Sequence, residues 1–170
     1  MYDVPVHARS RLFWTRLTIA VVWLAVVSPG AKALYDHRHY REAIVVGPGV
    51  TEIRRLSDYN LGVKDTANDV SVYVMDSGVP GGTALILGGT HPEEPQGPVS
   101  ATMFIENVIP VQGRLIVCAR ANRSASTVTR AGDAYPQFFE IPTEFGSRRF
   151  RMGDRWSNPL DSWPDPEVYI

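Results

Sequence analysis

The chain has 170 residues, 44% of them hydrophobic and 21% charged, which is typical of one globular domain. Its 17 basic and 18 acidic residues leave a formal net charge of −1, so the strongly basic footprint of a nucleic-acid-binding protein is absent and no nucleic-acid partner is expected. The single cysteine, Cys118, excludes an internal disulfide. It lies in the apolar run 115–119, where a buried, unreactive thiol is expected.

The first 33 residues have the three regions of a secretory signal peptide. Arginines precede an apolar stretch at 17–27, and a Ser-Pro-Gly sequence at 28–30 is expected to break the helix. The Ala-Lys-Ala sequence at 31–33 has the small-x-small pattern of a cleavage site. We therefore expect residues 1–33 to be a signal peptide and the protein to be exported, to the periplasm or outside the cell. The alternative is an uncleaved signal anchor, which would be the protein's only membrane contact.

Beyond residue 33 the pattern predicts strands around one helix, the rhythm of an α/β layer fold. Apolar and β-branched runs predict strands at 43–46, 70–75, 84–87 and 114–119. Apolar residues at helical spacing predict a helix that begins at Pro98 and ends before Pro110. The sequence after Asn122 has little periodicity and is expected to be loop.

The polar stretch 34–42 is expected to be an irregular lead-in to the domain. It contains His37 and His39, whose alternate positions near a processed terminus are more typical of solvated side chains than of a metal site. We therefore expect both imidazoles to face solvent.

Potential metal ligands lie between the strand at 84–87 and the helix, in the sequence Gly-Gly-Thr-His-Pro-Glu-Glu-Pro-Gln-Gly at 88–97. His91 and Glu94 follow the carboxyl end of a predicted buried strand, where open α/β sheets place their ligands. An imidazole nitrogen and a carboxylate oxygen are both zinc ligands, and a catalytic zinc takes three protein ligands and keeps a position for water. The pair would supply two of these three ligands. Taken alone, the pattern also fits a surface turn whose His and Glu face solvent.

The order of these features resembles the metal-binding opening of the succinylglutamate desuccinylase and aspartoacylase family, which belongs with the zinc carboxypeptidases. The usual sequence of this motif in the family is close to Gly-Gly-x-His-Gly-Asn-Glu-Pro-x-Gly. Here Pro92 and Glu93 replace the Gly-Asn, and both ligand positions are kept. The resemblance covers roughly residues 70–170 and includes the predicted strand at 114–119 with the Arg-Ala-Asn-Arg sequence that follows it.

The resemblance implies an α/β fold in which residues 34–170 form the N-terminal part of a zinc-carboxypeptidase-like mixed sheet flanked by helices. It implies that His91 and Glu94 bind zinc and that the reaction is hydrolysis of an amide bond next to a carboxylate. The substrate would be a small molecule or peptide with a free carboxylate. The family's third ligand, its Asn-Arg pair and its general base are expected beyond Ile170. The alternative is an exported, non-catalytic α/β binding module with a relic metal site.

No catalytic role is expected for the other charged residues around the motif. Glu93 is not expected to act as the base, because the turn that aims Glu94 at the metal aims its neighbour elsewhere. Any of four arginines is able to contact an anionic substrate, although a solvated surface role is more typical of each: Arg120, Arg123, Arg130 and Arg155.

Our first prediction concerns export. The mature protein should begin at Leu34, because Ala33 closes the small-x-small site after an apolar core of suitable length. N-terminal sequencing of protein recovered outside the cytoplasm measures this directly. A chain that starts at Met1 in the membrane fraction would show an anchor instead.

Overall fold

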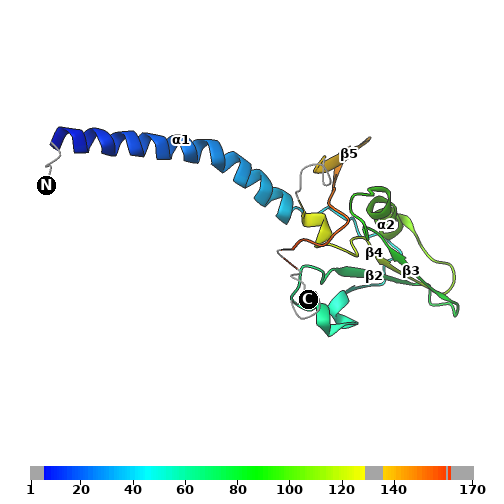
Figure 1. The fold of residues 1–170 in the computed structure, drawn as a ribbon. Helices are drawn as coiled ribbons and strands as arrows, with labels where there is room; N and C mark the ends of the chain where they lie inside the picture. Colours follow the sequence, from blue (N-terminus) through cyan, green and yellow to red (C-terminus); the bar gives the residue numbers. More distant parts are fainter. Residues whose placement is uncertain (1–5, 129–135, 160, 162–170) are drawn as a thin grey trace. The chain divides into compact units, whose positions relative to one another are not determined.

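The computed structural model describes residues 6–128, 136–159 and 161, with side chains from residue 10 onward. The chain divides into two compact units, Met1–Asp36 and His37–Ile170. Figure 1 traces the chain through both units.

One long helix, α1 (Val6–His39), contains the apolar N-terminal stretch. Its part from Ser10 to His39 is long enough, and over a continuous stretch apolar enough, to cross a membrane, which is compatible with a signal sequence or a membrane anchor. The expected break at 28–30 is wrong, because Pro29 lies inside α1. Proline removes one hydrogen bond from a helix, but its fixed φ is close to helical, so the turns on either side can continue.

The helix also continues through most of the stretch that was expected to be irregular. His37 is fully buried, so the prediction that it faces solvent is wrong, whereas His39 is exposed. The imidazole of His37 packs edge-on against Phe138 with ring centroids 5.1 Å apart, and its Nε2 lies 3.3 Å from the carbonyl oxygen of Met152. Both partners are more than a hundred residues away along the chain, so no local pattern could reveal this burial.

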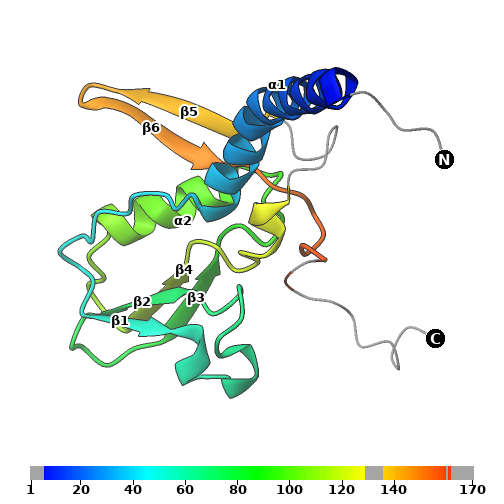
Figure 2. The same cartoon turned by 90° about the vertical axis from the view of Figure 1, so that its left-hand side faces the viewer.

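A mixed four-stranded sheet organises the second unit (Figure 2). Its strands are β1 (Glu52–Arg55), β2 (Ser71–Asp76), β3 (Thr83–Leu87) and β4 (Arg114–Cys118). The order is β1-β2-β4-β3, with antiparallel pairs except for the parallel pair of β3 and β4. Three of the four predicted strands are thus confirmed. β1 was not predicted because its Glu-Ile-Arg-Arg sequence is exposed and carries little β-branched character.

The helix α2 (Gln96–Asn107) packs against β3 and β4, and its first residue precedes the predicted start. Ala101 and Ile105, one turn apart, are buried in the core with Met75 of β2 and Val117 of β4. This strand–helix–strand arrangement confirms the predicted mixed α/β content. Burial of these side chains is the main apolar contribution to the stability of this unit.

The stretch 43–46 is not a strand, contrary to our prediction. It runs beside α2 (Figure 2), where the Val45 N–H donates to Glu106 Oε1 at 2.9 Å. The guanidinium of Arg148 donates to both carboxylate oxygens of Glu106, at 2.6 and 2.8 Å. A Cβ at Gly47 would lie 2.3 Å from the Glu106 carbonyl oxygen, so only glycine fits there. The backbone of this stretch is therefore held by a helix end and a distant arginine instead of a sheet.

A second, two-stranded sheet lies in the part of the chain that was expected to be loop. It consists of β5 (Phe138–Thr143) and β6 (Gly146–Arg151), paired antiparallel. Phe139 stacks on Phe150 across the pair, with centroids 5.4 Å apart. The hairpin was missed because arginines occupy both faces of β6 and a proline lies within β5, which hides the alternation of a half-buried strand.

Our second prediction concerns the Glu106–Arg148 ion pair. Burial alone raises the pKa of Glu106, but hydrogen bonds from Arg148 and the Val45 N–H outweigh it and hold the pKa below its ordinary value. Glu106→Gln should lower the free energy of unfolding by about 1–3 kcal/mol at pH 7. A carboxyl group whose pKa is lowered by folding stabilises the folded protein at pH values above its unfolded-state pKa of about 4.3. This contribution is lost as the pH falls through the folded-state pKa.

The test is denaturant unfolding of the full chain in neutral detergent at several pH values. The difference between wild type and Glu106→Gln should shrink as the pH falls below about 4.3. Glu144→Gln, at an exposed position in the turn between β5 and β6, is the matched control and should change stability by less than about 0.5 kcal/mol. A pH-independent difference would contradict the assignment.

Candidate functional site

The predicted metal-binding turn begins where β3 ends. Because β3 and β4 are parallel, their carboxyl ends meet at one edge of the sheet, and the loops that follow them lie together. The Gly88 N–H donates to the Cys118 carbonyl oxygen at 2.7 Å, and the Ala121 N–H donates to the Gly88 carbonyl oxygen at 2.8 Å. The turn is therefore anchored to the segment that follows β4.

The two glycines before the turn have different physical roles. A Cβ at Gly88 would lie 2.6 Å from Ala101 Cβ and 2.8 Å from the Gly97 carbonyl oxygen, so glycine allows α2 to pack directly on the end of β3. Gly89 has a φ of +63°, in the left-handed region that other residues rarely adopt. Together they turn the chain sharply from β3 toward His91.

His91 and Glu94 face each other across this turn. Nδ1 of His91 lies 3.7 Å from Oε1 of Glu94, and the two side chains are 42% and 50% exposed. Two ligands that share one tetrahedral zinc at about 2.0–2.1 Å are separated by roughly 3.3 Å. A small side-chain rotation would bring the pair to that spacing, and Pro92 between them is buried and fixes the turn. The pair therefore supplies two donors at close to the spacing of zinc ligands, one fewer than the three protein ligands of a catalytic site.

Glu93 points to a different partner. Nε and a terminal nitrogen of Arg155 each lie 2.9 Å from Oε1 of Glu93, and the second lies 3.9 Å from Oε1 of Glu94. The Arg155 side chain is 53% exposed, so it also remains open to solvent next to the His91–Glu94 pair. Of the three candidate arginines that the structure describes, Arg155 is the one whose guanidinium lies against Glu93 and Glu94.

Within the part of the chain that the structure describes, no group of three or more His, Cys, Asp or Glu residues could hold a metal ion. Arg130 lies outside the described residues. Cys118 is 3% exposed and burial raises the pKa of its thiol, which confirms the expected burial of this cysteine.

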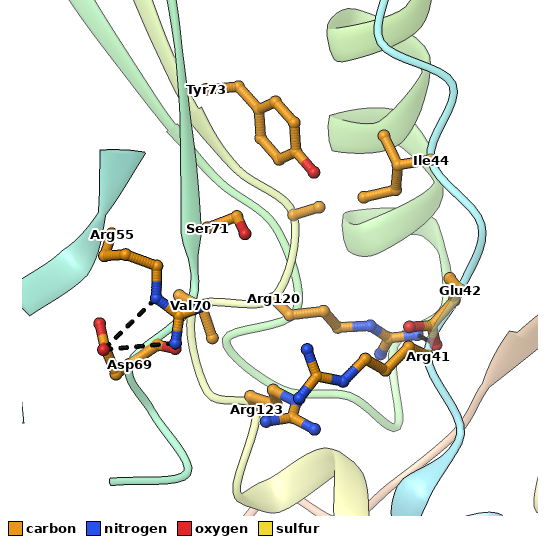
Figure 3. A pocket seen from close by; sticks show the side chains of 11 residues that line it. Arg41, Glu42, Ile44, Arg55, Asp69, Val70, Ser71, Tyr73, Arg120 and Arg123 are labelled. Atoms are coloured by element: carbon orange, nitrogen blue, oxygen red, sulfur yellow. Dashed lines mark hydrogen bonds and ion pairs between the residues drawn. The ribbon is translucent and has the colours of Figure 1, made fainter. Parts of the chain in front are cut away.

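A second feature of this unit, which sequence analysis missed, is a pocket of about 290 Å³ between β2, the segment after β4 and the stretch after α1 (Figure 3). We call it the arginine pocket. Its charged lining consists of Arg41, Glu42, Arg55, Asp69, Arg120 and Arg123. No local motif marks these residues, because they come from four segments of the sequence.

Arg120 is the most enclosed of these arginines. Its side chain is 10% exposed and forms an ion pair with Glu42, so the surface role expected for it is wrong. It also donates to the Arg151 carbonyl oxygen at 2.9 Å. Burial lowers the pKa of Arg120, while the adjacent Glu42 carboxylate opposes that effect.

Arg123 lies in the same pocket, where less negative charge offsets its own positive charge. Burial lowers its pKa, and the positive charge of Arg41 lowers it further. Figure 3 shows the two guanidinium groups side by side. The neighbouring Arg151 is 2% exposed, and burial lowers its pKa to about 10. The region therefore gathers more positive than negative charge in a partly desolvated place.

Comparison with known proteins gives no relative for this chain: no family model, no curated protein and no solved structure matches it.

Our third prediction tests the close packing at the start of the turn. Gly88→Ala should lower the free energy of unfolding by about 1–3 kcal/mol, because its methyl group would overlap Ala101 and Gly97. Gly82→Ala is the matched control, since a Cβ there would meet nothing within 4 Å. It should change stability by less than about 0.5 kcal/mol. Chemical denaturation of the three proteins measures both effects, and equal stabilities would refute the packing.

Proposed function

We propose that this protein is a zinc-dependent hydrolase of an amide bond next to a carboxylate, of the deacylase or carboxypeptidase-like type. The observation that carries the proposal is the 3.7 Å approach of His91 Nδ1 and Glu94 Oε1 at the carboxyl end of a parallel strand. Two half-exposed side chains of the right chemistry and nearly the right spacing favour a metal site over an unrelated surface turn. The family resemblance of the surrounding motif adds support.

The proposed roles of the residues follow from their positions. His91 and Glu94 would hold the metal, and Pro92 and the two glycines would fix the direction of both side chains. Zinc bound there would act as a Lewis acid on the substrate carbonyl and activate water. Arg155, whose guanidinium lies beside the pair, would orient the substrate by binding its carboxylate, a group that arginine recognises through parallel hydrogen bonds.

We further propose that the mixed sheet is part of a zinc-carboxypeptidase-like domain and that the protein is exported. The parallel β3–α2–β4 crossover with ligands after β3, and the apolar helix α1, support these proposals. The second candidate function is a non-catalytic exported binding module. The arginine pocket favours it, because that pocket offers a binding site for an anion away from the His91–Glu94 pair.

Our fourth prediction concerns zinc. The chain should bind zinc weakly, because two protein ligands leave the other coordination positions to water. His91→Ala and Glu94→Ala should each abolish this binding, whereas Glu93→Gln should change it little, because Glu93 is paired with Arg155. Calorimetric titration of zinc into the full chain in neutral detergent measures all four proteins.

Two results would change the proposal. If His91→Ala binds zinc as well as wild type does, the turn is not a metal site and the hydrolase proposal fails. If wild type binds at nanomolar affinity, a third protein ligand completes the site.

A further inference from the structure

We propose that the arginine pocket binds a small oxyanion, the carboxylate or phosphate group of a small molecule, at a site separate from the His91–Glu94 pair. Neither His91 nor Glu94 lines this pocket. Its volume of about 290 Å³ is near the lower end of the roughly 300–1,000 Å³ typical of small-molecule sites. The proposal does not depend on the hydrolase proposal.

The charges that line the pocket do not cancel. Four arginines face two carboxylates, Glu42 and Asp69, and both carboxylates are already engaged. Glu42 accepts hydrogen bonds from Arg120 and from the Arg151 N–H, the latter at 2.9 Å. Asp69 lies 3.3 Å from Arg55 and accepts from the Ser57 N–H at 3.0 Å. Neither carboxylate forms a hydrogen bond or an ion pair with the remaining two arginines in the described ranges.

Those two arginines, Arg41 and Arg123, form the proposed binding group. No hydrogen bond or ion pair joins either of them to another residue in the described ranges. Figure 3 shows their guanidinium groups together at one end of the pocket, below that of Arg120. Two adjacent like charges repel each other, and after burial the positive charge of Arg41 is a further cause of the lowered pKa of Arg123. An oxyanion placed between them would replace the repulsion with charge-assisted hydrogen bonds.

Partial burial strengthens this argument. Of the two binding arginines, Arg123 is half-buried and burial lowers its pKa, whereas Arg41 is exposed. A partly desolvated positive charge is costly unless it is paired, so a bound anion would stabilise Arg123 more than it would a solvated arginine. The hydroxyls of Ser71 and Tyr73 also line the pocket and supply neutral donors. The pocket thus has the charge and donor groups of a carboxylate or phosphate site.

The experiment measures anion binding by the full chain in neutral detergent. Inorganic phosphate and succinate are compared with sodium chloride at equal ionic strength, by thermal unfolding and by calorimetry. An anion that binds the folded protein raises the melting temperature in a concentration-dependent way. We expect phosphate or succinate, but not chloride, to do so, and the tighter of the two identifies the oxyanion. Equal melting temperatures in all three salts would overturn the proposal.

Variants locate the site. Arg41→Met and Arg123→Met should each weaken the binding by about tenfold or more, and Arg123→Lys should weaken it less because it retains the charge. Arg54→Met is the matched control: Arg54 adjoins Arg55 on β1, does not line the arginine pocket and should leave binding unchanged. Wild-type affinity in Arg41→Met and Arg123→Met would also overturn the proposal, since the anion would then bind elsewhere.

Two further measurements separate a loss of anion binding from misfolding and from an effect on the zinc site. Protection of the buried Cys118 thiol from a thiol reagent reports whether each variant is folded. His91→Ala should keep its phosphate or succinate binding, and Arg123→Met should keep its weak zinc binding. Loss of anion binding in His91→Ala would mean that the two sites are one, which would contradict the proposed separation.

Discussion

The close approach of α2 to the carboxyl end of β3 is the constraint on which the candidate site depends. Gly88 has no side chain, so the helix packs directly against the end of the strand. The backbone of Gly88 forms hydrogen bonds with Cys118 at the end of β4 and with Ala121 after it. This arrangement gives the turn a rigid base on the core. Side chains that hold a metal need such a base, because their spacing must be kept within a few tenths of an ångström.

A second constraint joins distant segments around one carboxylate. Glu42, just after α1, accepts hydrogen bonds from Arg120 after β4 and from the backbone of Arg151 in β6. Arg120 in turn donates to the Arg151 carbonyl oxygen, which closes the network. Because Glu42 and Arg120 are both nearly buried, loss of either partner would leave an unpaired charge in a desolvated place. The position of the hairpin is therefore linked to the same residues that line the arginine pocket.

The two candidate sites both belong to the carboxyl end of the parallel pair β3 and β4, but they differ in character. The turn after β3 offers neutral and anionic ligands, half exposed, that suit a cation. The segment after β4 contributes Arg120 and Arg123 to a pocket with excess positive charge. The two proposals together assign two binding chemistries to one edge of the sheet. The loops after the strands, and not the strands themselves, present the groups that differ.

The sequence by itself determined the elements whose pattern is local. The apolar runs at 70–75, 84–87 and 114–119 and the helical spacing after Pro98 are strong periodic signals, and each is found as a strand or helix. The same holds for the burial of Cys118 and for the closeness of His91 and Glu94, because a two-residue separation in a tight turn leaves both side chains near each other.

Only the tertiary structure decided what depends on distant partners. The stretch 43–46 is apolar enough to be a strand, yet it lies along α2 because Glu106 and Arg148 satisfy its backbone there. His37 is buried because Phe138 covers it, and the arginine pocket exists because four segments converge around β2 and β4. Charge pairing and ring packing between residues far apart in sequence leave no periodic trace, so they become visible only when the chain is folded.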